Sequence, residues 1–139
     1  MRNLWLFLSL AILGSAAMAA QNSMSISRAV YVARAHDGGV ALEPAETLRR
    51  GDRVVLVMEW DGEPAQPFTL VSKVPNTLAY QRSGDRNVQV SVDGGRRWGR
   101  IGSLRHGDRL AAPEDVTNLR WRIASADDEG MRSYSAIVR

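Results

Sequence analysis

Acidic side chains alternate along one stretch of the chain, at Glu59, Asp61 and Glu63. Alternate residues of an extended strand share a face, so two of these carboxylates would lie about 7 Å apart. Glycosidases use carboxylate pairs at such separations. Asp61 and the following glycine are themselves a turn signal, however, and such a pair needs a cleft to acquire shifted pKa values. The pattern therefore favours a structural role for these residues over a catalytic pair.

Other residues with metal-binding or nucleophilic chemistry are few. His36 and His106 both stand beside glycine in turn sequences, which predicts exposure rather than a two-histidine metal site. The acidic run 127–129 lacks the alternating ligand spacing of a calcium loop, so a solvated turn is favoured, with calcium binding left open. The chain has no cysteine and no Gly-x-Ser-x-Gly motif after residue 20. We therefore expect no catalytic residue, no metal, no cofactor and no enzymatic activity.

The first 20 residues have the pattern of a secretory signal peptide. Arg2 precedes an apolar run over residues 4–13, and Ala17-Met18-Ala19 places small residues at a cleavage site. The run is shorter than the roughly 20 apolar residues that span a membrane, and no Arg-Arg pair precedes it. These features predict export by the general secretion route to the periplasm or the surface of a bacterium, with cleavage that leaves no membrane span.

Composition is that of one ordinary globular domain over residues 21–139. Of the 139 residues, 45% are hydrophobic and 24% charged, which excludes intrinsic disorder. The formal net charge of +3 falls to +2 once Arg2 is removed. A net charge of +2 gives only a weak electrostatic attraction to nucleic acid, so we expect no nucleic-acid partner.

Short apolar runs separated by turn signals fill this domain, and no helix is expected. Turns recur every 8 to 12 residues or so, a spacing typical of an antiparallel sandwich or barrel. The expected strands are 25–34, 40–43, 53–60, 66–73, 77–81, 87–92, 97–101, 118–124 and 131–138.

Alternation in the run near the C-terminus is typical of a strand with one buried face. Leu119, Trp121 and Ile123 share one side, and Arg120 and Arg122 share the other.

Residues 91–98 form a predicted structural hairpin whose key members are Asp93, Gly94, Gly95 and Trp98. The glycines tolerate positive φ, and the Asp93 carboxylate can accept backbone N–H groups inside the tight turn. Trp98 is expected to pack most of its ring under the hairpin. The segment resembles one Asp-box hairpin of sialidase-like propellers, with Arg97 in place of the threonine. A propeller needs several copies and a far longer chain, so the resemblance implies structure and no enzymatic role.

The order of features over about residues 48–138 resembles the bacterial conserved-repeat domain, an immunoglobulin-like module of unknown function in exported and surface proteins. The family usually carries Asp where this chain has Lys73, and an Asn-Gly-type hairpin where it has residues 61–64. The segments that carry the resemblance are 50–54 (RGDRV), 74–80 (VPNTLAY), 91–99 (SVDGGRRWG) and 113–121 (PEDVTNLRW).

The resemblance implies an immunoglobulin-like antiparallel β-sandwich of about seven to nine short strands, acting as a wall, spacer or adhesion module. We therefore expect a non-catalytic, monomeric envelope or cell-surface module whose partner is an envelope protein, a surface protein or a glycan.

An alternative interpretation is a small carbohydrate- or peptide-binding module that uses an exposed tryptophan beside arginines. One observation separates the two: either Trp60, Trp98 and Trp121 are all buried, or one lies at the surface near arginine side chains, Arg100 included. The residues expected to form such a surface are Trp121, Arg120, Arg96 and Arg97.

Overall fold

The computed structural model describes residues 24–62, 64, 66–124 and 130–139. The predicted signal peptide over residues 1–20, the acidic run 127–129 and Glu63 lie outside the described residues. The elements in chain order are β1 (Ile26–His36), β2 (Gly39–Pro44), β3 (Arg53–Trp60), β4 (Phe68–Lys73), β5 (Leu78–Ser83), β6 (Gln89–Ser91), β7 (Arg105–His106), β8 (Arg109–Leu110), a 3-10 turn η1 (Pro113–Asp115), β9 (Asn118–Ile123) and β10 (Met131–Val138).

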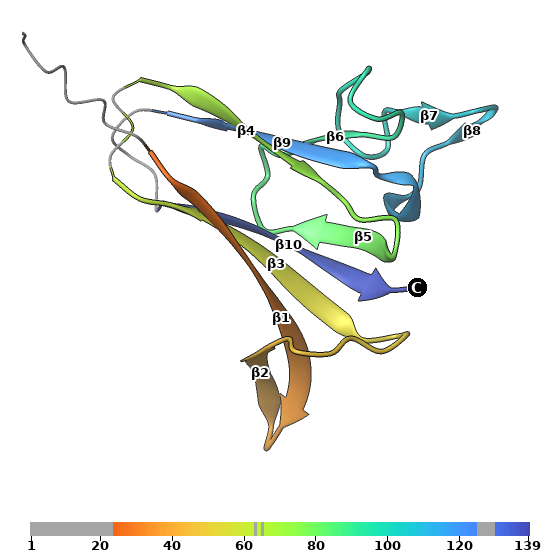
Figure 1. Ribbon diagram of the computed structural model, residues 1–139. Helices are drawn as coiled ribbons and strands as arrows, with labels where there is room; N and C mark the ends of the chain where they lie inside the picture. Colours follow the sequence, from red (N-terminus) through yellow and green to blue (C-terminus); the bar gives the residue numbers. More distant parts are fainter. Residues whose placement is uncertain (1–23, 63, 65, 125–129) are drawn as a thin grey trace, which may run out of the picture.

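Two antiparallel sheets face one another and make an all-β sandwich, so the predicted fold class is confirmed (Figure 1). The larger sheet has the order β2-β1-β3-β10-β5, and the smaller has the order β4-β9-β6. Strands β7 and β8, within the part of the chain that the structure describes, pair only with each other and extend from the side of the molecule as a short hairpin. Among the described residues, no helix is long and apolar enough to cross a membrane.

The last strand lies in the middle of the larger sheet, between β3 and β5. In an immunoglobulin domain the last strand instead lies beside the preceding strand in the second sheet. Here the chain crosses from one sheet to the other at every step from β3 to β6 and again from β9 to β10. Such repeated crossing is a feature of jelly-roll sandwiches, in which Greek-key connections wrap two sheets around one core.

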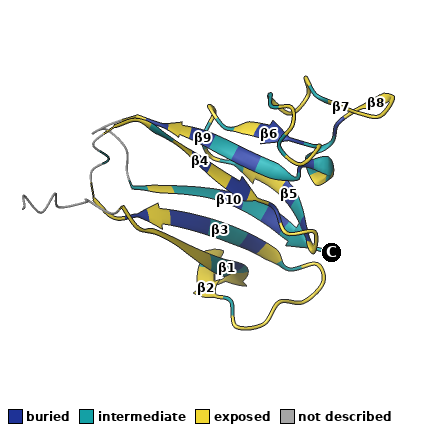
Figure 2. Ribbon diagram, turned by 45° about the horizontal axis from the view of Figure 1, so that its top comes forward, coloured by how far each residue is buried: buried dark blue, intermediate teal, exposed yellow. Residues whose placement is uncertain are grey.

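The core lies between the sheets because alternate residues of each strand point inward (Figure 2). Strand β9 contributes Leu119, Trp121 and Ile123, which are all at most 1% exposed. Strand β3 contributes Met58 and Trp60 from the facing sheet. These large side chains meet across the interface and supply the apolar burial that holds the two sheets together.

The β1–β2 hairpin extends beyond the sandwich, and most of β2 and the turn end of β1 are exposed (Figure 2), whereas Val32 on β1 is still part of the core. Its strands pair from Tyr31 with Pro44 to His36 with Gly39. Val40 and Leu42 on β2 are 69% and 51% exposed. β2 is also the outermost strand of its sheet.

The predicted strand over residues 97–101 is wrong. Only one isolated bridge forms there, between Gly99 and Val90, because Gly102 at φ 93° turns the chain away immediately afterwards. The short strands β7 and β8 were not predicted, since two-residue strands leave no alternation to detect.

Candidate ligand-binding site

The hairpin at residues 91–98 is built around the carboxylate of Asp93. Its Oδ1 accepts hydrogen bonds from the backbone N–H of Arg97 at 2.9 Å, the backbone N–H of Arg96 at 3.1 Å and the hydroxyl of Ser91 at 2.8 Å. These donors, the Arg97 amide foremost, hold the pKa of Asp93 below its usual range. Asp93 therefore has the amide-accepting geometry expected of it in the turn.

Glycine is required at the tip, because Gly94 and Gly95 adopt φ values of 77° and 92°. The loop is tied to the rest of the sandwich through Thr117, whose hydroxyl accepts the Gly94 N–H at 2.9 Å. The N–H of Thr117 in turn donates to the carbonyl of Ser91 at 2.8 Å. Because it is anchored at the start of β9, the hairpin holds Trp98 in a defined place.

Trp98 is partly buried and lies beside β9. A Cβ at Gly95 would come within 3.4 Å of the Trp98 ring, so the ring packs closely against the hairpin tip. The guanidinium of Arg120 lies over the ring, with its central carbon 4.5 Å from the ring centroid. The Arg120 Nε donates to the Gln89 Oε1 at 2.7 Å. A cation–π contact and a hydrogen bond thus fix Arg120 from two sides.

The outer face of the smaller sheet is cationic. Strands β4, β6 and β9 contain no Asp or Glu, whereas Lys73, Arg120 and Arg122 all point outward. The ion pairs found among the described residues lie elsewhere, at Arg34, Arg109 and Arg132. The positive charge of this face is therefore not neutralised by carboxylates on its own strands.

A cavity of about 370 Å³ opens on this same face. Three of its lining residues carry guanidinium groups and three carry neutral hydrogen-bonding groups. They come from β4, from β9, and from the segments before, within and after β6. The lining residues are Arg100, Arg120, Arg122, Thr69, Asn87 and Gln89. The cavity can therefore donate many hydrogen bonds and offers no negative charge of its own.

Of the residues expected to form a binding surface, Arg120 is placed there and Trp121 is not. The prediction for Trp121 is wrong, because its side chain is 1% exposed and faces the larger sheet beside Leu119 and Ile123. Arg96 and Arg97 are exposed, but their side chains are not among those that line the described cavity. Their backbone amides serve Asp93 instead.

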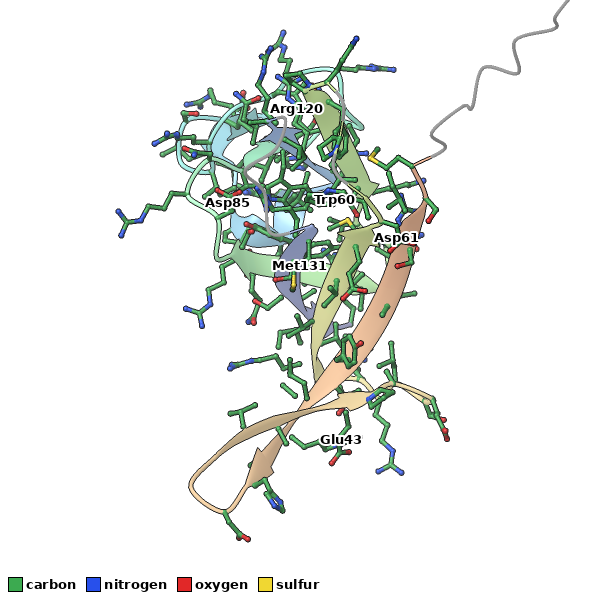
Figure 3. The ribbon with its side chains drawn as sticks, turned by 90° about the vertical axis from the view of Figure 1, so that its left-hand side faces the viewer. Glu43, Trp60, Asp61, Asp85, Arg120 and Met131 are labelled. Carbon is green, nitrogen blue, oxygen red and sulfur yellow. The ribbon has the colours of Figure 1, made fainter. Side chains whose placement is uncertain are left out.

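Of the three tryptophans in the described residues, Trp98 is partly buried and the other two are buried. Trp60 is 5% exposed and packs edge-on against Phe68, with ring centroids 5.6 Å apart. The observation that separates the two interpretations thus favours binding: one tryptophan lies at the surface beside an arginine. Figure 3 shows Arg120 at the end of the molecule formed by the smaller sheet, far from Glu43 on β2.

The cavity residues Thr69, Asn87, Gln89 and Arg122 were missed by sequence analysis. Alternation predicts that Arg120 and Arg122 share a face, but it carries no information about which strands flank them. The pairing of β9 with β4 and β6 places Gln89 opposite Arg120 and Thr69 opposite Arg122.

A second cavity, of about 780 Å³, lies on the outer face of the larger sheet and reaches the β1–β2 hairpin. Its lining combines apolar residues, among them Val40, Leu42 and Val55, with polar ones, among them Arg53 and Arg82. No group of three or more potential metal-ligating residues was found in the part of the chain that the structure describes. The smaller cavity is the better candidate for a charged ligand, because three guanidinium groups converge on it, against two around a cavity of about twice the volume.

Comparisons with known proteins add no family. No family model matches the chain, and searches of curated proteins and of solved structures found no match. The resemblance to the conserved-repeat domain therefore stays an expectation from segments 50–54, 74–80, 91–99 and 113–121.

Proposed function

We propose that the protein is an exported, non-catalytic envelope module that binds a carbohydrate or peptide ligand on the outer face of its smaller sheet. The observation that carries the proposal is the contact between the partly exposed Trp98 and the guanidinium of Arg120. Aromatic and arginine side chains dominate the energetics of many binding surfaces. Trp98 holds Arg120 beside a polar cavity, whose side chains give a ligand charged and hydrogen-bonding groups to bind.

The absence of catalysis is part of the proposal. Glu59 and Asp61 are both exposed, Asp61 accepts a hydrogen bond from Ser25, and neither carboxylate lines the cationic cavity. General acid–base catalysis by a carboxyl pair requires groups in a shared, partly desolvated site.

Binding can be tested with the mature protein, residues 21–139, on a panel of immobilised neutral and acidic polysaccharides and peptides. We expect at least one ligand to bind the parent, and Arg120→Gln to weaken that binding. Arg50→Gln removes an exposed arginine in the turn before β3 and should leave binding unchanged. The proposal fails if the parent binds nothing on the panel, or if Arg120→Gln binds as tightly as the parent.

Export is tested separately, by the intact mass of the protein recovered from the producing bacterium. The expected mature chain starts near Ala20 or Gln21, and retention of residues 1–19 in a membrane fraction would contradict it.

A second candidate function is that of a spacer or adhesion module. It is favoured by the exposed apolar residues Val40 and Leu42 on the outermost strand β2, a surface that suits a protein partner better than a small ligand. Substituting both residues with threonine should weaken surface attachment without changing ligand binding at Arg120.

A further inference from the structure

We infer that the cationic cavity recognises an acidic polysaccharide, and that its arginines bind the carboxylate or sulfate groups of the sugar chain. This inference rests on the proposed function and specifies the ligand class of the same site. Arg100, Arg120 and Arg122 all line one cavity of about 370 Å³. No carboxylate lines that cavity in the described part of the chain, so an acidic ligand meets uncompensated positive charge.

Planar guanidinium groups match the geometry of carboxylate and sulfate oxygens and can bind them through two parallel hydrogen bonds. Three guanidinium groups around one small cavity can therefore hold one or two such groups.

The three uncharged residues that line the cavity favour a ligand whose acidic group is carried by a sugar. Thr69 offers a hydroxyl, and Asn87 and Gln89 offer side-chain amides. These groups can donate to and accept from sugar hydroxyls, which are both donors and acceptors themselves. An anionic membrane surface would instead be expected to meet exposed apolar side chains that insert among lipids, whereas all six residues that line this cavity are polar or charged.

Trp98 is a positioning residue in this arrangement. Its ring packs against Gly95, and the Arg120 guanidinium lies over it, so little of the indole is left for a sugar to stack on. The ring and the Gln89 side chain together hold Arg120 in one orientation before the ligand arrives. Such preorganisation reduces the entropy lost when a long side chain is fixed on binding.

The sharpest test changes one atom beside Arg120. Gln89→Glu keeps the size and shape of the side chain but places a carboxylate where Gln89 Oε1 now lies, 2.7 Å from the Arg120 Nε. The new carboxylate should pair with Arg120 and repel an acidic ligand. The matched control is Gln81→Glu, which adds the same charge at an exposed position on β5 of the other sheet.

Binding is measured by calorimetry to polygalacturonate, to the same polymer with its carboxyls methyl-esterified, and to poly-L-glutamate. We expect the parent to bind polygalacturonate at least tenfold more tightly than its ester, and the affinity to fall steeply with salt. Gln89→Glu should weaken polygalacturonate binding by about tenfold or more, as expected for loss of a charge-assisted contact. Gln81→Glu should change it by less than about twofold. Dextran sulfate against neutral dextran extends the comparison to sulfate groups.

A second pair of variants tests the positioning role. Trp98→Phe keeps an aromatic face under Arg120 and should retain most of the affinity for polygalacturonate, whereas Trp98→Leu should weaken it several-fold. The urea midpoints of the two variants are measured alongside, and similar midpoints show that the difference in affinity does not come from folding. Equal affinities in both variants would overturn the positioning role.

The outcomes distinguish failure of the acidic-ligand inference from failure of the proposed function. If the ester or neutral dextran binds as tightly as the acidic polymers and Arg120→Gln weakens that binding, the acidic-ligand inference is overturned and the proposed function stands. If poly-L-glutamate binds more tightly than every acidic polysaccharide, the ligand is an acidic peptide and the inference is likewise overturned. If the parent binds none of these polymers and nothing on the wider panel, the proposed function itself is overturned.

Discussion

The guanidinium carbon of Arg120 lies 4.5 Å from the centroid of the Trp98 ring. The two residues belong to different elements, since Trp98 ends the 91–98 hairpin and Arg120 lies in the centre of β9. Their contact links the hairpin to the cationic face: Asp93 closes the turn, the turn positions Trp98, and Trp98 holds Arg120. A hairpin that sequence analysis treated as structural therefore also shapes the candidate site.

Trp98 and Trp121 differ in what they contribute to stability. Trp121→Ala removes a ring that is 1% exposed, so we expect the free energy of unfolding to fall by about 3–5 kcal/mol. Trp98→Ala removes a partly buried ring and one cation–π contact, so we expect a loss of about 1–3 kcal/mol. Urea unfolding of the two variants, followed by circular dichroism, measures both values.

Arg97→Thr is the control in this series, because the Arg97 side chain is exposed and only its backbone amide donates to Asp93. The variant should unfold within about 0.5 kcal/mol of the parent. An equal or larger loss for Trp98→Ala than for Trp121→Ala would contradict the burial order of the two rings.

The pH dependence of stability should report on Asp93. Its pKa is lower in the folded chain than in the unfolded chain, chiefly because the Arg97 amide and the Ser91 hydroxyl bond to the charged form. Its contribution is therefore present above the unfolded pKa and is lost as the pH falls through the folded pKa. We expect the urea midpoint of Asp93→Asn to lie below that of the parent at pH 7. The two midpoints should converge as the pH is lowered below about 4.

Asp37→Asn, in the exposed turn between β1 and β2, serves as the control for removal of a surface carboxylate. If the urea midpoints of Asp93→Asn and the parent differ by the same amount at pH 7 and below about pH 4, the Asp93 charge does not stabilise the turn.

Much of the sandwich follows from alternation and turn chemistry. The runs 53–60 and 131–138 match β3 and β10 at both ends, because each long run begins directly after a clear turn sequence. Alternation over residues 118–123 predicts that Trp121 shares a face with Leu119 and Ile123, and in the structure Trp121 is buried on that face. A tryptophan in a strand is best assigned by its alternate neighbours.

Relationships between distant segments could not be predicted. Gln89 and Arg120 lie 31 residues apart, and nothing local to either indicates that β6 pairs with β9 in that register. The central position of β10 in the larger sheet is equally non-local. Both depend on how the whole chain crosses between the sheets, which single-strand patterns do not encode.

Removal of β10 should abolish the fold. The strand pairs with β3 on one side and β5 on the other, and it contributes Tyr134 and Ala136 to the core at 1% and 0% exposure. A chain that ends at residue 130 would leave β5 without its neighbour in the larger sheet. We expect no cooperative urea transition, whereas a chain that lacks only Arg139 should unfold cooperatively. Cooperative unfolding of the shorter chain would contradict the central role of β10.

The β7–β8 hairpin should depend on a single ion pair. Arg109 on β8 contacts Asp115 through both ends of its guanidinium, at 2.6 and 2.9 Å, and Asp115 also accepts the Ala112 N–H at 2.8 Å. The Arg109 side chain, and then the Ala112 amide, hold the pKa of Asp115 well below its usual range. Because the hairpin pairs with no other strand among the described residues, this contact joins it to η1.

We therefore expect Asp115→Asn to speed amide hydrogen exchange across residues 105–110 by roughly two- to tenfold, as for the loss of one or two net hydrogen bonds. Exchange in β3 and β10 should stay at the parental rate, because neither strand contacts the pair. Asp115 stays ionised in the folded protein at both pH 7 and pH 5. The parent hairpin should therefore be equally protected from amide hydrogen exchange at the two pH values, after correction for the intrinsic exchange rates. Glu114→Gln, a carboxylate change one residue away in the same turn, is the matched control and should leave exchange unchanged. Equal exchange in Asp115→Asn and the parent would show that the hairpin is held by its own turn and not by η1.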